Sequence, residues 1–95
     1  MLFALICTDE LGKLSLRQDV RPKHVEFLNS LGERLKAAGP FLDPMDNPCG
    51  SLVIIEAKDM AEAKDVAAKD PYFLAGLFSN IEIRPWNWVF KNPGN

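Results

Sequence analysis

The chain has 95 residues, of which 47% are hydrophobic, so it can form one domain with a modest core. Its formal net charge is −2, and acidic and basic residues are interspersed without a basic patch or an acidic tail. Nucleic acid is therefore not an expected ligand. The apolar residues 1–7 run straight into Thr8, Asp9 and Glu10, which predicts a strand and not a signal peptide, and no other segment could span a membrane.

The two cysteines, Cys7 and Cys49, lie far apart and lack the spacing of metal ligands. They are typical of a reduced cytoplasmic protein with two ordinary thiols. The sequence has too few clustered His, Cys and carboxylate side chains for a metal site made by the protein. It also has no glycine-rich phosphate loop and no nucleophile elbow, so we expect neither a metal nor a cofactor.

Apolar runs bounded by turn residues alternate with helical patterns along the chain. Pro22 suits the opening position of a helix, and Gly39-Pro40 is a strong stop signal. Asp59 with Glu62 resembles a capping box for a second helix. In chain order we predict a strand at 1–8, a long loop and possible lid at 9–20, a helix at 22–38, a short strand from 41, a turn at 43–50, a strand at 51–57, a helix from 60 to before 71, a turn at 72–78 and a strand at 81–90.

This order predicts an α+β fold of the ferredoxin-like βαββαβ type, in which both helices cover the same face of an antiparallel sheet. The first strand is apolar on both faces, because Phe3 and Leu5 point one way while Ala4 and Ile6 point the other. Two helices cover only one face. A second copy of the sheet is therefore expected on the other face, so that the two sheets close as a dimeric α+β barrel in a two-fold homodimer.

Trp86, Trp88 and Phe90 share one face of the predicted last strand. They would add aromatic area near the contact between the two sheets. The alternative is that the tryptophans complete the core of the monomer.

His24 is the only histidine in the chain, and it lies where a leucine would be expected. On the predicted helix it shares an apolar face with Leu28, Leu31 and Leu35, so its ring should point toward the core. In the first helical turn, the positive end of the helix would disfavour the imidazolium form. A neutral, partly buried imidazole can accept or donate a proton. The alternative is a core histidine satisfied by a backbone carbonyl.

Asp70 extends the apolar face of the second predicted helix. Asp before Pro71 is also a standard N-cap, and this structural role is the alternative. The two helices should lie side by side on the sheet, so a contact between His24 and Asp70 is geometrically possible. A carboxylate on one ring nitrogen would fix the tautomer and leave the other nitrogen for chemistry.

The chain resembles the YciI-like (YCII-related) family of small dimeric α+β barrel proteins in two motifs, RPKH at residues 21–24 and KDPYFLAGLF at residues 69–78. The resemblance covers nearly the whole chain and implies a single domain at residues 1–95. It also implies that His24 and Asp70 lie together in a cleft as an acid/base pair. The wider pattern includes Arg17, Gly39-Pro40, Gly50-Ser51, Ala75-Gly76 and Pro85.

A distant relation in fold to muconolactone isomerases, and family members associated with chlorinated aromatic breakdown, imply small organic acids or lactones as substrates. The resemblance thus implies a cofactor-free enzyme of the lyase, isomerase or hydrolase type that transfers protons. The alternative is a non-catalytic dimeric module that binds a metabolite or another protein.

Five further residues are candidates for substrate binding. Arg17 and Arg21 could neutralise a substrate carboxylate beside the imidazole, or they could be solvated or paired with neighbouring acids. Asp9 could reach the cleft or form a turn, and Tyr72 could line the pocket through its hydroxyl or simply pack. Ser51 is a candidate through its place in the family pattern.

Overall fold

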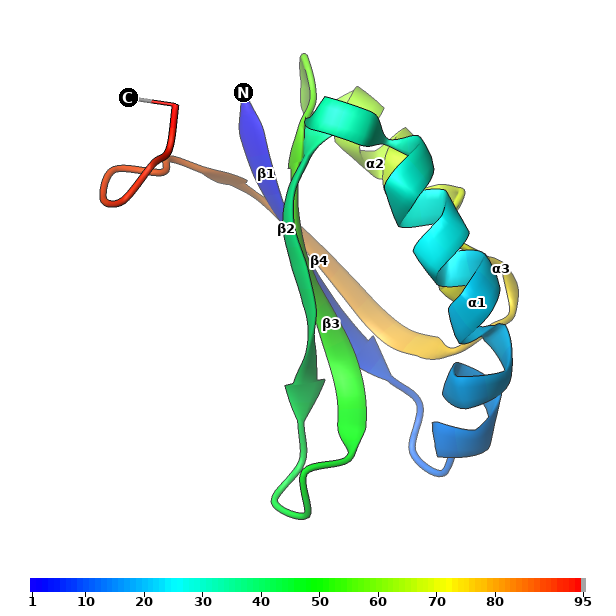
Figure 1. The fold of residues 1–95 in the computed structure, drawn as a ribbon. Coiled ribbons are helices and arrows are strands. Elements are labelled where there is room, and N and C mark those ends of the chain that lie inside the picture. Colours follow the sequence, from blue (N-terminus) through cyan, green and yellow to red (C-terminus); the bar gives the residue numbers. More distant parts are fainter. Residues whose placement is uncertain (95) are drawn as a thin grey trace.

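The computed structural model describes residues 1–94 and shows a four-stranded antiparallel sheet with helices on one face (Figure 1). The strand order is β2-β3-β1-β4, which confirms the predicted ferredoxin-like α+β fold. Within residues 1–94, none of the helices combines the length and the apolar character needed to span a bilayer. The elements are β1 (Leu2–Asp9), α1 (Leu14–Ser30), the short 3-10 helix η1 (Gly32–Arg34), β2 (Leu35–Leu42), β3 (Pro48–Glu56), α2 (Met60–Ala68), α3 (Pro71–Leu74) and β4 (Phe78–Trp86).

The start of α1 differs from the prediction. The helix begins at Leu14, so the predicted lid at 9–20 is wrong and Pro22 lies inside the helix. The proline ring removes one backbone N–H from the helix interior, and the rest of the helix tolerates that loss. His24 is consequently far from the first turn. The positive helix end therefore does not act on its ring, contrary to the sequence argument.

The end of α1 also differs, because Gly39-Pro40 is not the stop signal. The helix ends at Ser30, and Gly32 follows with a φ of 59°, a left-handed conformation that glycine adopts without a steric penalty. Gly39 and Pro40 lie in β2. Since β2 pairs only with β3, it is an edge strand, where a proline without an N–H is tolerated.

The second half of the chain follows the prediction more closely. α2 begins at Met60 as predicted, and Asp59 Oδ1 accepts the backbone N–H of Glu62 at 2.9 Å. The short helix α3 begins at Pro71 and overlaps the first half of the predicted turn at 72–78. β4 ends at Trp86, so the expected strand at 81–90 is shifted toward the N-terminus by several residues.

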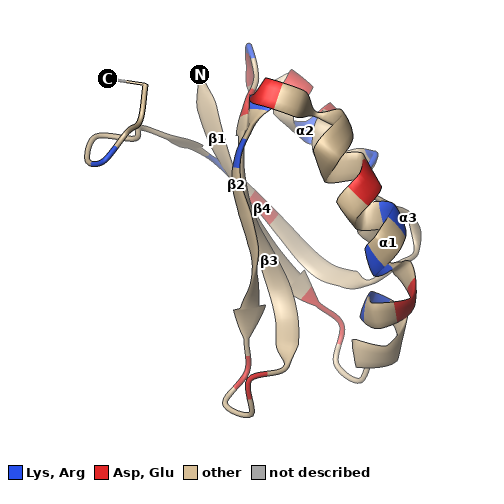
Figure 2. Ribbon diagram, in the orientation of Figure 1, with Lys and Arg blue, Asp and Glu red and all other residues tan. Residues whose placement is uncertain are grey.

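The sheet face opposite the helices is left without a covering layer (Figure 1). The strands carry few charged residues, whereas charges gather on the helices and loops (Figure 2). Trp86 is 41% exposed and its ring centroid lies 5.6 Å from that of Trp88, so the tryptophans do not belong to the core beneath the helices. A hollow of about 560 Å³ on this face is lined by Ala4, Ile6, Ala37, Leu52, Ile54, Arg84, Pro85, Trp86 and Trp88.

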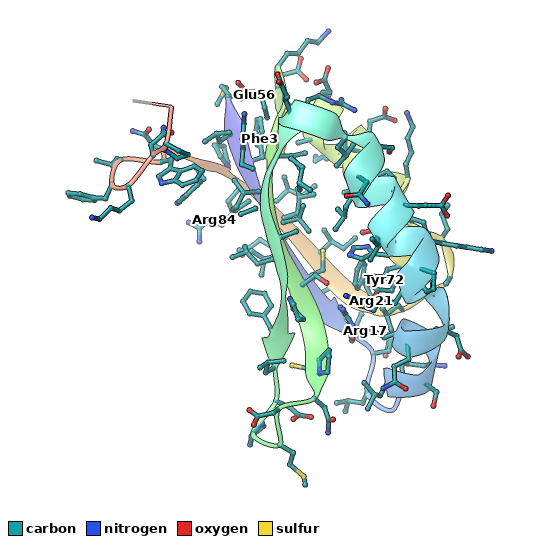
Figure 3. The ribbon with its side chains drawn as sticks, in the orientation of Figure 1. Phe3, Arg17, Arg21, Glu56, Tyr72 and Arg84 are labelled. Atoms are coloured by element: carbon teal, nitrogen blue, oxygen red, sulfur yellow. The ribbon has the colours of Figure 1, made fainter. Side chains whose placement is uncertain are left out.

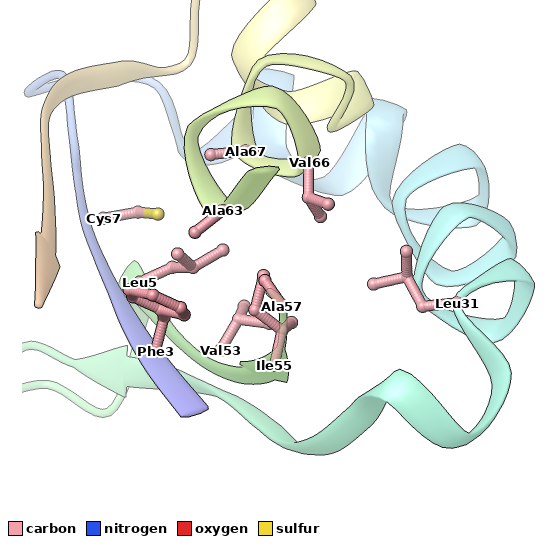
Figure 4. Packing of buried hydrophobic residues seen from close by; sticks show 10 residues of the cluster. All are labelled: Phe3, Leu5, Cys7, Leu31, Val53, Ile55, Ala57, Ala63, Val66 and Ala67. Carbon is pink, nitrogen blue, oxygen red and sulfur yellow. The ribbon is translucent and has the colours of Figure 1, made fainter. Parts of the chain in front are cut away.

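The core lies between the sheet and the helices (Figure 4). The alternation predicted for β1 is observed, because Phe3 and Leu5 point into this core while Ala4 and Ile6 line the opposite face. The same alternation carries Cys7 and Asp9 toward the helices at the end of β1. The core consists of Phe3, Leu5, Cys7, Leu31, Val53, Ile55, Ala57, Ala63, Val66 and Ala67.

Candidate functional site

His24 on α1 and Asp70, just before α3, form a buried hydrogen bond. His24 Nδ1 lies 2.9 Å from Asp70 Oδ1, and the two side chains are only 10% and 9% exposed. An ionised carboxylate only accepts hydrogen bonds, so Nδ1 donates. In the neutral ring the lone pair is then on Nε2. The contact expected from the sequence is present.

Asp70 also caps α3. The same Oδ1 accepts the backbone N–H of Tyr72 at 2.9 Å. The two interpretations of Asp70, as a helix cap and as the partner of His24, are therefore both correct. Because one oxygen serves both contacts, the imidazole is held in a fixed position relative to α3.

Tyr72 packs directly on His24. The two ring centroids are 3.9 Å apart and the rings are nearly parallel, at 16°. Burial raises the pKa of the Tyr72 hydroxyl, and the charges of Arg17 and Arg21 offset part of that rise. The phenol therefore stays protonated at neutral pH and can donate a hydrogen bond.

Arg17 is buried, so it is not solvated, and it is paired with an acid, which was one of the alternatives that the sequence left open. Its Nε and Nη2 donate to the two carboxylate oxygens of Asp9 at 2.7 and 3.1 Å, and Nη2 also donates to Ser51 Oγ at 2.7 Å. Its Cζ lies 4.6 Å from the ring centroid of Tyr72. Burial alone would lower the pKa of this guanidinium, but the hydrogen bond and charge of Asp9 raise it above its ordinary value.

The strand register explains how this cluster forms. Cys7 on β1 pairs with Ser51 on β3, and both residues face the helices. Asp9 lies two residues further along β1 on the same face. Asp9 is thus a buried partner of Arg17, and neither the turn residue nor the group reaching the cleft that the sequence allowed.

A cavity of about 210 Å³ lies between α1 and the strands β2 and β3. Apolar side chains such as Val25, Leu28 and Val53 form part of its wall. No carboxylate lines it, and Asp9 and Asp70 are bonded to the lining residues Arg17 and His24. Its polar lining comes from Arg17, Gln18, Arg21, His24, Ser51 and Tyr72.

Arg21 is the exposed cation of this site. Figure 3 shows Arg17, Arg21 and Tyr72 together on the helix side of the sheet, and Arg84 on the opposite side. The cavity therefore combines an imidazole, a phenol and two guanidinium groups. Such a lining can bind a small anion and move a proton on it. Larger hollows on the opposite sheet face, near Trp86 and Trp88, have no histidine and carboxylate pair.

Sequence reasoning missed two features of the site, the stack of Tyr72 on His24 and the cluster of Arg17 with Asp9 and Ser51. Arg17 lies two helical turns before His24, so both fall on one face of α1. The sequence predicts a helix that begins only at Pro22, so it does not place Arg17 on the helix face of His24. The cluster also joins residues far apart in the chain, and spacing alone does not predict such contacts.

Comparisons with known proteins identify the family and agree with the fold. The family model of the YCII-related domain matches residues 1–87. Protein YciI of Escherichia coli O6:H1 is 34% identical over 98 residues, covering 95% of this chain and 100% of that protein. A protein of Haemophilus influenzae is 34% identical over 99 residues, with the same coverage of 95% and 100%.

Two solved structures extend the comparison. The 5-chloro-2-hydroxyhydroquinone dehydrochlorinase of Burkholderia phenoliruptrix AC1100, in complex with 2,5-dihydroxybenzoquinone, has a TM-score of 0.86 at 29% identity, over 97% of this chain and 99% of that one. SnoaB, a cofactor-independent oxygenase of Streptomyces nogalater, has a TM-score of 0.57 at 10% identity over 96% of each chain, and it shares the fold alone. On these matches, the chain belongs to the family of the YCII-related domain.

Proposed function

We propose that this protein is an enzyme that moves protons on a small oxygenated substrate without the help of a cofactor. His24 acts as the general base and acid, and Asp70 is its positioning residue. The observation that carries the proposal is the hydrogen bond from His24 Nδ1 to Asp70, at 2.9 Å beside the cavity. It leaves Nε2 as the nitrogen that exchanges a proton with a ligand.

The size and charge of the cavity support a proposal for the substrate class. A volume of about 210 Å³ is below the range typical of drug-sized ligands and suits a single ring or a short acid. Arginine side chains without a lining carboxylate favour an anion. The similar dehydrochlorinase was solved with 2,5-dihydroxybenzoquinone, a flat ring that carries several oxygens. We therefore propose a hydroxylated ring, a small organic acid or a lactone-like compound as substrate.

The proposed reaction begins when His24 Nε2 takes a proton from a carbon or hydroxyl of the substrate. The electron pair of that bond stays on the substrate, which becomes an anion. Asp70 stabilises the resulting imidazolium through its existing hydrogen bond, and Arg21 at the exposed side of the cavity neutralises the anion. The imidazolium then returns its proton to another atom of the substrate. Alternatively, the anion expels a leaving group together with its electron pair, and the imidazolium gives its proton to that group.

Asp9 and Ser51 act as positioning residues in this scheme. Both hold Arg17 through hydrogen bonds of 2.7 to 3.1 Å, so the guanidinium has a fixed orientation next to the cavity. A fixed cation stabilises a developing negative charge without reorganisation at the moment of reaction.

We also propose that the protein is a two-fold homodimer joined through the sheet faces. The supporting observation is the uncovered face with Leu52, Trp86 and Trp88, which is apolar and hollowed. Since the cavity with His24 lies on the helix side of the sheet, each protomer then holds its own site.

The variant His24→Asn tests the catalytic role. An asparagine amide can still donate to Asp70 in place of Nδ1, but it has no equivalent of Nε2. A thermal-shift screen of small acids, lactones and hydroxyquinones identifies ligands, because binding to the native state raises its stability. Exchange of ligand hydrogens with deuterium from solvent, followed by NMR, then reports proton transfer.

We expect exchange with the wild type and none above background with His24→Asn, although both bind the ligand. Equal exchange rates in the two proteins would contradict the proposal. Binding without exchange in the wild type would favour the non-catalytic binding module instead.

A further inference from the structure

Two polar atoms in the site have no protein partner within residues 1–94, the Tyr72 hydroxyl and His24 Nε2. Tyr72 is only 1% exposed and His24 is also buried. Yet every fully buried side-chain nitrogen or oxygen among those residues has a hydrogen-bond partner. Both atoms must therefore reach accessible surface, and both residues line the 210 Å³ cavity. The cavity is the space that borders both residues, and a ligand in it could approach both unpartnered atoms.

The ring stack holds these two groups in a defined relation. The imidazole and the phenol lie face to face, with centroids 3.9 Å apart. Asp70 fixes both residues, since its Oδ1 accepts from the ring of one and the backbone of the other, at 2.9 Å in each case. Phe78 packs edge-on against Tyr72, with the two ring centroids 6.0 Å apart, and this contact further restricts the phenol. These contacts therefore restrain both rings before any ligand binds.

We propose that Tyr72 is a second catalytic residue, whose hydroxyl donates a hydrogen bond to the substrate oxygen that becomes negative when His24 takes the proton. This inference rests on the proposed function and narrows its substrate class. When Nε2 removes a proton from the carbon beside a carbonyl, the C–H electron pair forms a C=C bond and the C=O pair moves onto oxygen. Tyr72 stabilises that oxyanion, as a preorganised donor does in other enzymes.

The surroundings of Tyr72 suit a donor. Arg17 lies 4.6 Å from the centre of the phenol ring, and its charge makes the hydroxyl a stronger donor. Burial meanwhile keeps the phenol protonated at neutral pH, because it raises the pKa. A neutral donor beside cations favours a substrate in which loss of the proton places negative charge on an oxygen through conjugation. Hydroxyquinones, phenols and enolisable ketones meet this requirement, and simple carboxylic acids do not.

The variant Tyr72→Phe removes the hydroxyl and keeps the ring that stacks on His24. We use 2,5-dihydroxybenzoquinone as the probe, because it combines the ring size and the conjugated oxygens that the cavity requires. Titration calorimetry should show binding about 10- to 100-fold weaker than in the wild type, the loss expected for one hydrogen bond to a charged oxygen. Ser79→Ala is the control, because it removes an exposed hydroxyl outside the cavity, and it should bind as the wild type does.

A second readout needs no substitution at Tyr72. Tyr72 is the only tyrosine in the chain, so tyrosine labelled with ¹³C at Cζ gives one NMR signal. We expect the probe to shift this signal in the wild type and in His24→Asn, which retains Tyr72 but loses proton transfer.

An unchanged signal together with unchanged affinity in Tyr72→Phe would overturn the inference and leave the role of His24 standing. If proton transfer persists in His24→Asn, the proposed function itself fails. If the wild type does not bind the probe, the substrate class and this inference fail together.

Discussion

A single oxygen of Asp70 holds the imidazole of His24 at 2.9 Å. Because the same atom caps α3 through the backbone N–H of Tyr72, the orientation of the His24 ring is coupled to a helix terminus. The contact joins α1 to α3 across the site. Its contribution to stability and its contribution to function can be separated by substitution.

We predict that the pair serves function more than stability. His24→Leu removes a buried polar ring but leaves the Asp70 carboxylate without its partner, at a cost of about 1 to 3 kcal/mol in the free energy of unfolding. Asp70→Asn keeps an oxygen that can cap α3. The double variant should therefore recover nearly the stability of the wild type while losing proton transfer. Denaturant midpoints of the single and double variants form the necessary cycle. A double variant much less stable than the wild type would show that the pair is structural.

The two arginines of the site should behave in opposite ways. Arg17→Met leaves the Asp9 carboxylate buried without a partner and should cost about 3 to 5 kcal/mol of stability. Arg21→Met is the matched control, because Arg21 is exposed, and it should change stability by less than about 0.5 kcal/mol. Chemical denaturation measures both. Arg21→Met should instead weaken the binding of the anionic probe, so similar losses of stability in the two variants would contradict this assignment.

Stability at high pH should depend on Cys7. Burial, with the nearby charge of Asp70, raises the pKa of its thiol from 9.0 to about 12. Between these values the unfolded state releases the thiol proton and the folded state retains it, so stability is full below pH 9 and falls as pH rises toward 12. The slope from this group is at most about 1.4 kcal/mol per pH unit.

Cys7→Ala tests this prediction, since the variant lacks the thiol while Tyr72 titrates in both proteins. Denaturant unfolding at several pH values above 9 should give a shallower loss of stability for the variant. Parallel pH profiles for the two proteins would show that Cys7 does not contribute.

A charged side chain introduced on the uncovered sheet face should disrupt the proposed homodimer. Leu52 on β3 is 36% exposed and lines the hollow on that face, so Leu52→Glu should convert the proposed dimer to monomers. Leu74→Glu makes the same chemical change at a residue of α3 that is 71% exposed on the helix side, and it should leave the dimer intact. Sedimentation velocity at micromolar concentration distinguishes the two results. A wild type that sediments as a folded monomer would disprove the dimer outright.

The sequence was sufficient for the fold and for the main pair of the site. Alternation in β1 and the cap signals at Asp59 and Asp70 are local, so they were correctly predicted. The bounds of α1 were wrong because Pro22 and Gly39 are ambiguous. A proline can open a helix or interrupt one, and a glycine with a proline can end a helix or lie in an edge strand.

The environment of Arg17 could not be predicted for a different reason. Its partners Asp9 and Ser51 come from two strands, and their proximity depends on the register between β1 and β3. The contact between His24 and Asp70 was nevertheless correct despite the misplaced helix, because it requires only that α1 cross the sheet beside the start of α3.

The central claim is that Asp70 fixes His24 with its proton on Nδ1 and presents Nε2 to the cavity. His24 is the only histidine, so ¹⁵N NMR of labelled protein reports its two ring nitrogens without overlap. At a pH where the ring is neutral, we predict a protonated Nδ1 and an unprotonated Nε2, and only Nε2 should respond directly to 2,5-dihydroxybenzoquinone. Asp70→Ala, which removes the oxygen that accepts from Nδ1, should lose this single tautomer. A wild-type ring protonated on Nε2, or a mixture of tautomers that the probe does not change, would contradict the account.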